Sequence, residues 1–226
     1  PARTLTSRGD TLYMGTAQGL WRYTGGAPTR VRGVPRVQVY ESLAVESDVL
    51  LTTAAGVYAV RGATARRISP WSGYGLAASA TDPNTAYVGL QDGGVGRVQR
   101  VQGQWQARGT MQHDTKGLAY TVAEDAHNAL WLGTGASIYR VENAFERRVD
   151  PVVTRYDTTH GLPAASFNFA VPVGDAVRFI TQEGLYRFQP DAKRFVPDAD
   201  FAAVYTDSTL LGWPVVAPNA REVWMD

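Results

Sequence analysis

A short strand, a tight turn that contains glycine and a second short strand recur along this chain, and this repeat constrains the fold most. The motif occupies Leu12–Tyr23, Leu50–Val60, Ala86–Val98, Leu130–Val141, Val177–Phe188 and the terminal Glu222–Asp226. Its copies begin 36 to 47 residues apart. The runs are short and rich in β-branched and aromatic residues, which is typical of strands and not of the long apolar faces of a helical solenoid.

A period of this length is that of a four-stranded propeller blade. We therefore predict an all-β fold, a β-propeller with five four-stranded blades and part of a sixth. The expected blades span residues 3–33, 37–69, 75–108, 117–157 and 166–197, with a partial sixth blade at 213–226. Because a blade covers its two faces only with its neighbours, we expect an incomplete arc of a larger, seven-bladed propeller. We interpret the chain, which begins at Pro1, as an excised or incomplete segment.

The glycine between the two strands of each motif indicates a tight hairpin, whose backbone needs a positive φ. Gly19, Gly56, Gly94 and Gly184 fill this position. The fourth copy has Ser137 there, with Gly135 two residues earlier, so its turn should differ in shape. Two tryptophans inside the motif strands, Trp21 and Trp131, are expected in the core.

Composition excludes several classes of function. The chain carries 22 basic and 21 acidic residues, a net charge of +1, so it has no basic field for nucleic acid. It contains no cysteine, which excludes disulfides and thiolate zinc sites. No run approaches 18 apolar residues, so we expect no membrane contact by this segment. We predict no cofactor and no metal site.

Three segments carry a resemblance to a known family. Leu130–Val141 resembles the two-component regulator propeller repeat, which pairs Leu-Trp-Ile-Gly-Thr with a Gly-Leu-x-Arg-Tyr strand. Tyr156–Phe169 is similar to the family's inter-blade linker with Gly-Leu-Pro and Phe-Asn, and Gln182–Pro190 matches the strand after that linker. The resemblance covers essentially the whole chain. The second copy is degenerate, with Thr52-Thr53 in place of Gly-Thr.

This resemblance implies a periplasmic or extracellular sensor region of a membrane-anchored histidine kinase or hybrid two-component protein. The input it implies is a small molecule or an oligosaccharide, and the segment itself is not expected to be an enzyme. Binding would transmit a signal by changing the packing of the propeller or the geometry of a homodimer. A ligand does this only if it binds one arrangement more tightly than the other.

Two alternatives stay open. Ala80–Gly96 is more similar to repeats of sialidase- and xyloglucanase-type propellers, which favours a carbohydrate-active hydrolase. Those enzymes usually carry Asp-boxes of the form Ser-x-Asp-x-Gly-x-x-Trp, and this sequence has none. A scaffold that binds other proteins is the second alternative, and a flat, exposed apolar patch would favour it.

Alternating strand direction places each inter-blade loop and each loop between second and third strands on the same face of a propeller. Loops on a rigid scaffold are where binding groups concentrate. The ligand-binding candidates on this face are Trp71, Tyr74, Gln91, Asp92, His113, Asp114, His160, Gln182 and Glu183, with Gln18 and Lys116 beside them.

Five of the candidates also have a second interpretation. Trp71 and Tyr74 could stack on a sugar ring, or pack between blades. His113 and Asp114 could act as an acid–base or metal-binding pair, although adjacent residues rarely aim at one point, which favours a solvated loop. His160 is interpreted as a loop residue.

Overall fold

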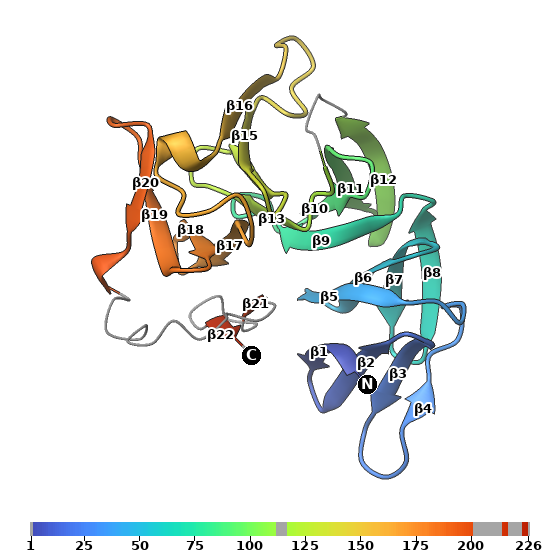
Figure 1. Cartoon of the computed structure of the whole chain (residues 1–226). Helices are drawn as coiled ribbons and strands as arrows, with labels where there is room; N and C mark the ends of the chain where they lie inside the picture. The colour runs from blue at the N-terminus through green and yellow to red at the C-terminus, as the bar shows by residue number, and fades with distance from the viewer. Residues whose placement is uncertain (1, 112–116, 201–213, 217–222, 226) are drawn as a thin grey trace. The chain divides into compact units, whose positions relative to one another are not determined.

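The chain folds into a series of antiparallel sheets, shown in Figure 1 as a computed structural model. The structure describes residues 2–111 and 117–200, and the backbone of Pro214–Val216 and Val223–Met225. These residues contain five four-stranded sheets, each built from four strands consecutive in the chain, and one two-stranded sheet. The predicted all-β architecture with five four-stranded sheets is confirmed.

The strands have the following bounds. The first sheet contains β1 (Ala2–Arg8), β2 (Thr11–Thr16), β3 (Gly19–Tyr23) and β4 (Thr29–Arg30). The second contains β5 (Val39–Val45), β6 (Asp48–Thr53), β7 (Gly56–Arg61) and β8 (Thr64–Ser69). The third contains β9 (Gly73–Ala78), β10 (Thr85–Leu90), β11 (Val95–Val101) and β12 (Gln104–Met111).

The fourth sheet contains β13 (Thr121–Glu124), β14 (Leu130–Gly133), β15 (Ile138–Glu142) and β16 (Val152–Tyr156). The fifth contains β17 (Phe169–Val173), β18 (Ala176–Thr181), β19 (Gly184–Gln189) and β20 (Arg194–Pro197). One turn of 3₁₀-helix, η1 (Thr158–His160), precedes the fifth sheet, and β21 (Pro214–Val216) pairs with β22 (Val223–Met225). Within the described residues, no helix is long and apolar enough to cross a membrane.

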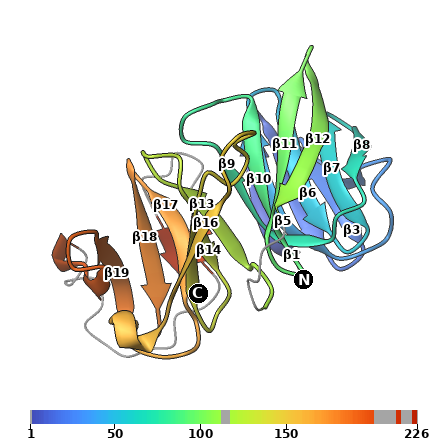
Figure 2. The same cartoon turned by 90° about the horizontal axis from the view of Figure 1, so that it is seen from above.

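The chain divides into two compact units, residues 1–119 and 120–226. Unit 1 holds the first three sheets, which pack face to face in sequence order (Figure 2). Their first strands, β1, β5 and β9, lie against one another, while β4, β8 and β12 form the opposite edges. Unit 2 holds the remaining sheets.

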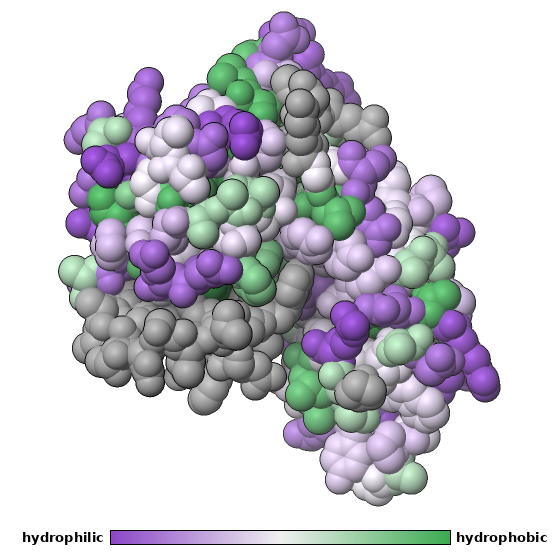
Figure 3. Space-filling model, in the orientation of Figure 1, coloured by the Kyte–Doolittle hydropathy of each residue, from purple (hydrophilic) through white to green (hydrophobic). Residues whose placement is uncertain are grey.

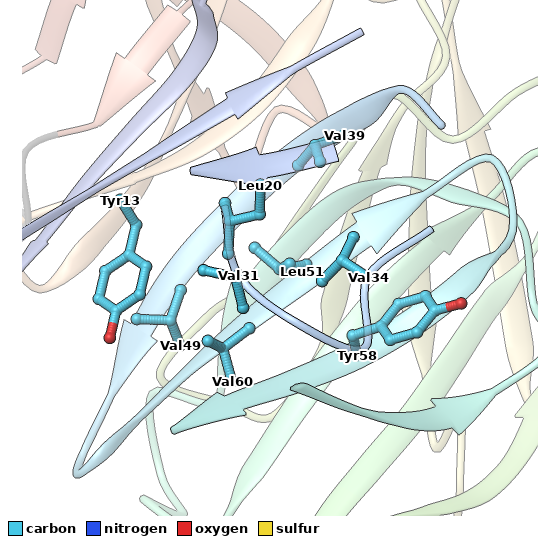
Figure 4. Close-up of a cluster of buried hydrophobic side chains, with 9 residues drawn as sticks. All are labelled: Tyr13, Leu20, Val31, Val34, Val39, Val49, Leu51, Tyr58 and Val60. Carbon is cyan, nitrogen blue, oxygen red and sulfur yellow. The ribbon is translucent and has the colours of Figure 1, made fainter. Parts of the chain in front are cut away.

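The first and second sheets enclose an apolar core (Figure 4). It consists of Tyr13 and Leu20 from the first sheet, Val31 and Val34 from the connection, and Val39, Val49, Leu51, Tyr58 and Val60 from the second sheet. Each of these side chains is at most 5% exposed. Successive strand residues point to opposite faces, so Trp21, next to Leu20, points away from this core. Trp21 is therefore only half-buried, and the prediction of a core position was wrong.

A buried carboxylate joins the second sheet to the third. Asp48, at the start of β6, accepts hydrogen bonds from Nε and Nη2 of Arg61 (2.7 and 3.0 Å). It also accepts one from the indole Nε1 of Trp105 on β12 (3.2 Å). Trp105 is 1% exposed and belongs to the core between these sheets, so its N–H has no access to water. Asp48 supplies the partner that the buried indole needs.

An aromatic core occupies unit 2 between the fourth and fifth sheets. Trp131, 3% exposed as predicted, meets Phe179, Phe188 and Phe195 edge-on and stacks on Tyr156. Its Nε1 donates to the Asp125 carboxylate (2.8 Å). Such edge-on contacts suit the ring quadrupole and add to the energy of burial.

Threonine side chains close four of the five hairpins between second and third strands. In the first sheet, the Thr16 hydroxyl donates to the Gly19 carbonyl (2.8 Å) and accepts from the Gln18 N–H (3.0 Å). Thr53 and Thr181 make the same pair of bonds. The predicted positive φ is confirmed at all four glycines of this position: Gly19, Gly56, Gly94 and Gly184.

The fourth hairpin has the different shape that its sequence predicts. Positive φ falls on Gly135, at 80°, instead of on Ser137. The Thr134 hydroxyl still donates to the Ser137 carbonyl (3.0 Å), but accepts from the Ser137 N–H (3.2 Å) rather than from the residue before it.

A polar cluster lies between β1 and β5. The Ser42 hydroxyl is 2.6 Å from the hydroxyls of both Thr4 and Thr6, and the Thr6 hydroxyl also bonds the Ser42 carbonyl (3.0 Å). Glu41 accepts from the Ser42 N–H (3.1 Å). Burial raises the pKa of Glu41 from 4.5 to about 7, against the opposing effect of hydrogen bonds from Ser42 and Thr4.

We expect Asp48→Ala to lower the free energy of unfolding by about 2 kcal/mol, because it leaves the buried indole N–H of Trp105 without a hydrogen-bond acceptor. Arg61→Ala, the control, should cost less than about 1 kcal/mol, since the Arg61 side chain is 57% exposed and keeps its hydration. Urea unfolding measures both. Equal losses for the two variants would contradict this role of Asp48.

We expect Glu41→Gln to change how stability depends on pH. A carboxyl whose pKa is raised in the folded state favours folding fully below pH 4.5, and this contribution is lost as pH rises through about 7. The variant should therefore gain roughly 1–3 kcal/mol relative to wild type between these pH values. Urea unfolding at several pH values tests this, and a pH-independent difference would contradict it.

Candidate binding site

The loops that enter each sheet and the hairpins between second and third strands meet at one edge, which we call the loop edge. In the second sheet, the Ala54 N–H donates to the Gln38 carbonyl (3.1 Å). In the third sheet, the Gln91 N–H donates to the Ser72 carbonyl (3.0 Å). In unit 2, Gly135 and Asn168 pair as an antiparallel bridge. The predicted convergence of these two kinds of loop is therefore confirmed within each unit.

A cavity of about 470 Å³ opens at the loop edge of the third sheet. We call it the Trp71 pocket, and its described lining consists of Pro70, Trp71, Ser72, Leu90, Gln91, Asp92 and Thr110. Three of the predicted candidates, Trp71, Gln91 and Asp92, thus line one cavity. Leu90 is buried, Trp71 and Gln91 are half-buried, and Asp92 and Thr110 are exposed. The pocket combines an aromatic ring with amide, carboxylate and hydroxyl groups.

The hairpin that carries Gln91 and Asp92 departs from the other four. Leu90 occupies the position of the closing threonine, and the loop has one residue more. Gly93 and Gly94 both have positive φ, at 88° and 80°, and the Leu90 N–H donates to the Gly94 carbonyl (3.2 Å). The extra length and the lost threonine let this loop project Gln91 and Asp92 over the pocket.

Trp71 is held in place by a glycine. A Cβ at Gly96 on β11 would lie 2.7 Å from Cε3 and 2.8 Å from Cζ3 of the indole. The six-membered ring of Trp71 therefore packs directly on the backbone of β11, which only glycine permits. The ring thus packs on one strand and also lines the pocket, and its stacking on a sugar ring stays a prediction.

Tyr74 does not share the pocket. It lies on β9, and its ring packs against Tyr40 of β5 with centroids 4.2 Å apart and an interplanar angle of 45°. Its carbonyl accepts from the Thr52 hydroxyl (2.9 Å). Trp71 and Tyr74 therefore do not form one surface for a single sugar ring. They belong to two separate aromatic groups at the loop edge.

His160 has a structural partner in η1. Asp157 caps this turn, with its carboxylate accepting from the Thr159 N–H (3.0 Å), while His160 Nδ1 accepts from the Asp157 N–H (3.3 Å). The Thr159 hydroxyl, the Thr159 N–H and His160 lower the pKa of Asp157. The imidazole thus completes a capping box, as suits a loop residue.

The remaining candidates are spread over other loops. Gln182 and Glu183 are exposed in the β18–β19 hairpin, where Glu183 accepts from the Tyr186 hydroxyl (3.2 Å). Burial, with Glu183 nearby, raises the pKa of Tyr186. Gln18 is exposed in the β2–β3 hairpin. His113, Asp114 and Lys116 lie outside the described residues. Among the residues that are described, no cluster of histidines and carboxylates could hold a metal ion.

Three polar or aromatic residues in or beside the pocket escaped the sequence analysis. Thr110 comes from the outer strand β12, whose register shifts where Arg108 is inserted opposite β11. Ser72 lies in the chain between the aromatic candidates Trp71 and Tyr74 and was not singled out. Tyr40 stands at the same repeat position as Tyr74, directly after the first residue of its strand that pairs with the second strand. Alignment of the repeats would have found it.

The surface in Figure 3 mixes hydrophilic residues with small apolar groups over the face that it presents. A binding surface on such a face is formed by local cavities with a few polar groups, as in the Trp71 pocket, rather than by a broad apolar patch.

Comparison with solved structures decides the fold. The extracellular domain of the hybrid two-component system protein BT3049 from B. thetaiotaomicron matches with a TM-score of 0.69 and 14% identity, over 99% of this chain and 31% of that chain. The WD40 β-propeller domain of Doa1 matches with a TM-score of 0.58 and 12% identity, over 88% and 64%. The chain has the β-propeller fold.

An enzyme shares this propeller fold. Virginiamycin B lyase from Staphylococcus aureus matches with a TM-score of 0.60 and 13% identity, over 86% of this chain and 68% of the lyase. No protein-family model matches the chain, and a search of curated proteins also found no match. Because one fold carries an extracellular domain of a two-component system protein and a lyase, function has to be argued from the site. The number of blades in the whole propeller stays a prediction.

We expect Gly96→Ala to lower the free energy of unfolding by about 1–3 kcal/mol, because the new methyl displaces the Trp71 ring. In a Trp71→Ala background the methyl enters vacated space, so the loss should shrink by at least about 1 kcal/mol. Urea unfolding of wild type, both single variants and the double variant gives this coupling. Additive losses would show that Trp71 does not rest on Gly96.

Proposed function

We propose that this chain is an extracytoplasmic sensing segment of a two-component receptor and that it binds a saccharide in the Trp71 pocket. The observation that carries the proposal is the composition of that pocket. An indole supplies an apolar face for the C–H groups of a sugar ring, and the side chains of Gln91, Asp92 and Thr110 supply acceptors and donors for its hydroxyls. The volume lies in the range of about 300–1,000 Å³ typical of small-molecule sites.

Two further observations support the sensing role. The repeat and linker motifs at Leu130–Val141 and Tyr156–Phe169 resemble those of two-component sensor propellers. The chain also shares the fold of the extracellular domain of BT3049, of which it spans 31%. A periplasmic or extracellular location and an output through a histidine kinase belong to the same proposal.

The pocket favours binding over hydrolysis. Glycoside hydrolysis generally uses two carboxylates on opposite sides of the scissile bond. Asp92 is the one carboxylate among the described residues that line the pocket. Among these described residues, a bound sugar would therefore meet hydrogen-bonding groups and a single carboxylate.

A glycan array, followed by calorimetry with the best glycan, tests the proposal. We expect Trp71→Ala to weaken binding at least about tenfold, the equivalent of about 1.4 kcal/mol, through loss of the aromatic surface. Trp21→Ala is the matched control, because Trp21 is also half-buried but lies on β3 of the first sheet.

Two results would contradict the proposal. One is unchanged glycan affinity in Trp71→Ala, which would place binding elsewhere. The other is the appearance of shortened glycans in mass spectra after incubation with the protein, which would favour a hydrolase instead.

A further inference from the structure

The first strands of all three sheets in unit 1 carry a β-bulge at the same repeat position. In β1 the register to β2 shifts between Ala2 and Thr4, so Arg3 is the inserted residue. In β5 it shifts between Val39 and Glu41, which inserts Tyr40. In β9, Tyr74 and Gly75 together face Gly89 of β10. Arg3, Tyr40 and Tyr74 are therefore equivalent residues, which we call the bulge row.

A bulge takes one residue out of the regular ladder, bends the strand and redirects its side chain, and bulges are frequent beside functional sites. Here the same irregularity recurs in three repeats whose sequences otherwise differ. β5 lies between β1 and β9, in contact with both, so the three bulges are neighbours (Figure 1). Because the bulges repeat at equivalent positions of neighbouring strands, they form one row along the loop edge.

Contacts across the sheets hold the bulge row in one geometry. The Thr52 hydroxyl, fully buried on β6, donates to the Tyr74 carbonyl (2.9 Å) and so anchors the bulge of the next sheet. The Arg3 guanidinium donates from Nη1 and Nε to the side-chain oxygen of Gln38, at 3.0 and 3.2 Å, with the amide in the orientation that satisfies both groups. Tyr40 and Tyr74 pack ring to ring at 4.2 Å.

The bulge row presents suitable groups for a ligand. Arg3 is exposed, and Tyr40 and Tyr74 are half-buried. Two phenol rings give apolar surface with a polar tip, and a guanidinium gives several N–H donors for hydroxyl or acid groups. Rigid aromatic groups ordered before binding cost little entropy when a ligand arrives.

The bulge row begins next to the Trp71 pocket. Tyr74 follows Trp71 by three positions in the chain, so their Cα atoms are at most roughly 10 Å apart. That distance is covered by a disaccharide or a trisaccharide. One ligand could therefore occupy the pocket with its first ring and continue over the two tyrosines towards Arg3.

We propose that the bulge row is a second part of the binding site, and that the ligand is a saccharide chain of at least two linked rings laid across β9, β5 and β1. This inference rests on the proposed function and adds the size and direction of the ligand. It assigns binding roles to Tyr40 and Arg3, and it gives Tyr74 a role separate from that of Trp71.

Calorimetry with saccharides of increasing length tests this inference. The probes are the cello-, malto-, manno-, xylo- and galacturonate series, each with one, two, four and six rings. For a series that binds, affinity should rise at least about tenfold between one ring and four rings. Tyr40→Ala and Tyr74→Ala should remove most of this gain and leave the affinity for the single ring unchanged.

Controls separate binding from folding. Tyr23→Ala is the matched variant, because Tyr23 is an exposed tyrosine, 40% accessible, on β3 away from the bulges. It should bind like wild type at every length. Thermal unfolding of each variant shows whether the sheets remain folded, and Tyr40→Phe, which keeps the ring, should retain most of the gain.

The outcomes distinguish this inference from the proposed function. Length-independent affinity that Trp71→Ala abolishes would overturn the bulge row and leave the pocket in place. A length-dependent gain that survives in Tyr40→Ala and Tyr74→Ala would also overturn it. A gain lost in both tyrosine variants but kept in Trp71→Ala would support the row and overturn the pocket. Absence of binding to every series would overturn both.

Discussion

A sheet with two apolar faces is stable only when neighbouring sheets cover both of them. The second sheet shows this constraint most directly. Every residue of β6 is buried, with Val49 and Leu51 in the core shared with the first sheet and Leu50 in the core shared with the third. A strand of alternating polarity would leave one face in water. Burial on both faces explains why Val49, Leu50 and Leu51 are apolar without alternation, and why repeats are stable only in series.

The packed faces hold the backbone at the loop edge in a defined geometry. Two polar groups between sheets have specific partners: Asp48 accepts from the Trp105 indole, and Thr52 donates to the Tyr74 carbonyl. Buried networks of this kind favour one arrangement of the chain over others, because any alternative would leave donors or acceptors unpaired. The loop edge can therefore vary in sequence without loss of the scaffold.

The candidate site lies where the repeat is least regular. Four hairpins use a threonine to close a short turn, whereas the third uses Leu90 and a longer loop that carries Gln91 and Asp92 to the Trp71 pocket. The bulges of β1, β5 and β9 are a second departure from regular pairing. Local departures of this kind, kept within an otherwise consistent fold, are expected at functional positions.

The repeat period and the hairpin glycines were sufficient to predict the sheets, because both follow from local sequence. The environment of single side chains was harder to predict. Trp21 and Trp131 both lie in strands of the repeated motif, in different copies. Trp21, however, lies on the face of the first sheet that points away from the second. The motif defines the strand, but burial depends on which neighbour covers that face.

The site was predicted in part for a similar reason. Strand direction alone places Trp71, Gln91 and Asp92 on one edge. Whether Tyr74 joins them depends on the bulge that starts β9, and Thr110 enters through the shifted register of β12. His160 is a capping residue because of the 3₁₀ turn at its own position. Bulges and turns of this kind depend on pairing between strands, which spacing along the chain does not show.

Hydrogen exchange in the presence and absence of a bound saccharide tests most directly whether the loop edge of the third sheet is the binding site. The account predicts slower exchange at the Gln91 amide, which donates to the Ser72 carbonyl, and at its neighbours in the hairpin. Amides of the outer strand β8 should exchange at unchanged rates. Protection confined to β8 or to unit 2, with residues 70–72 and 90–92 unaffected, would contradict the account.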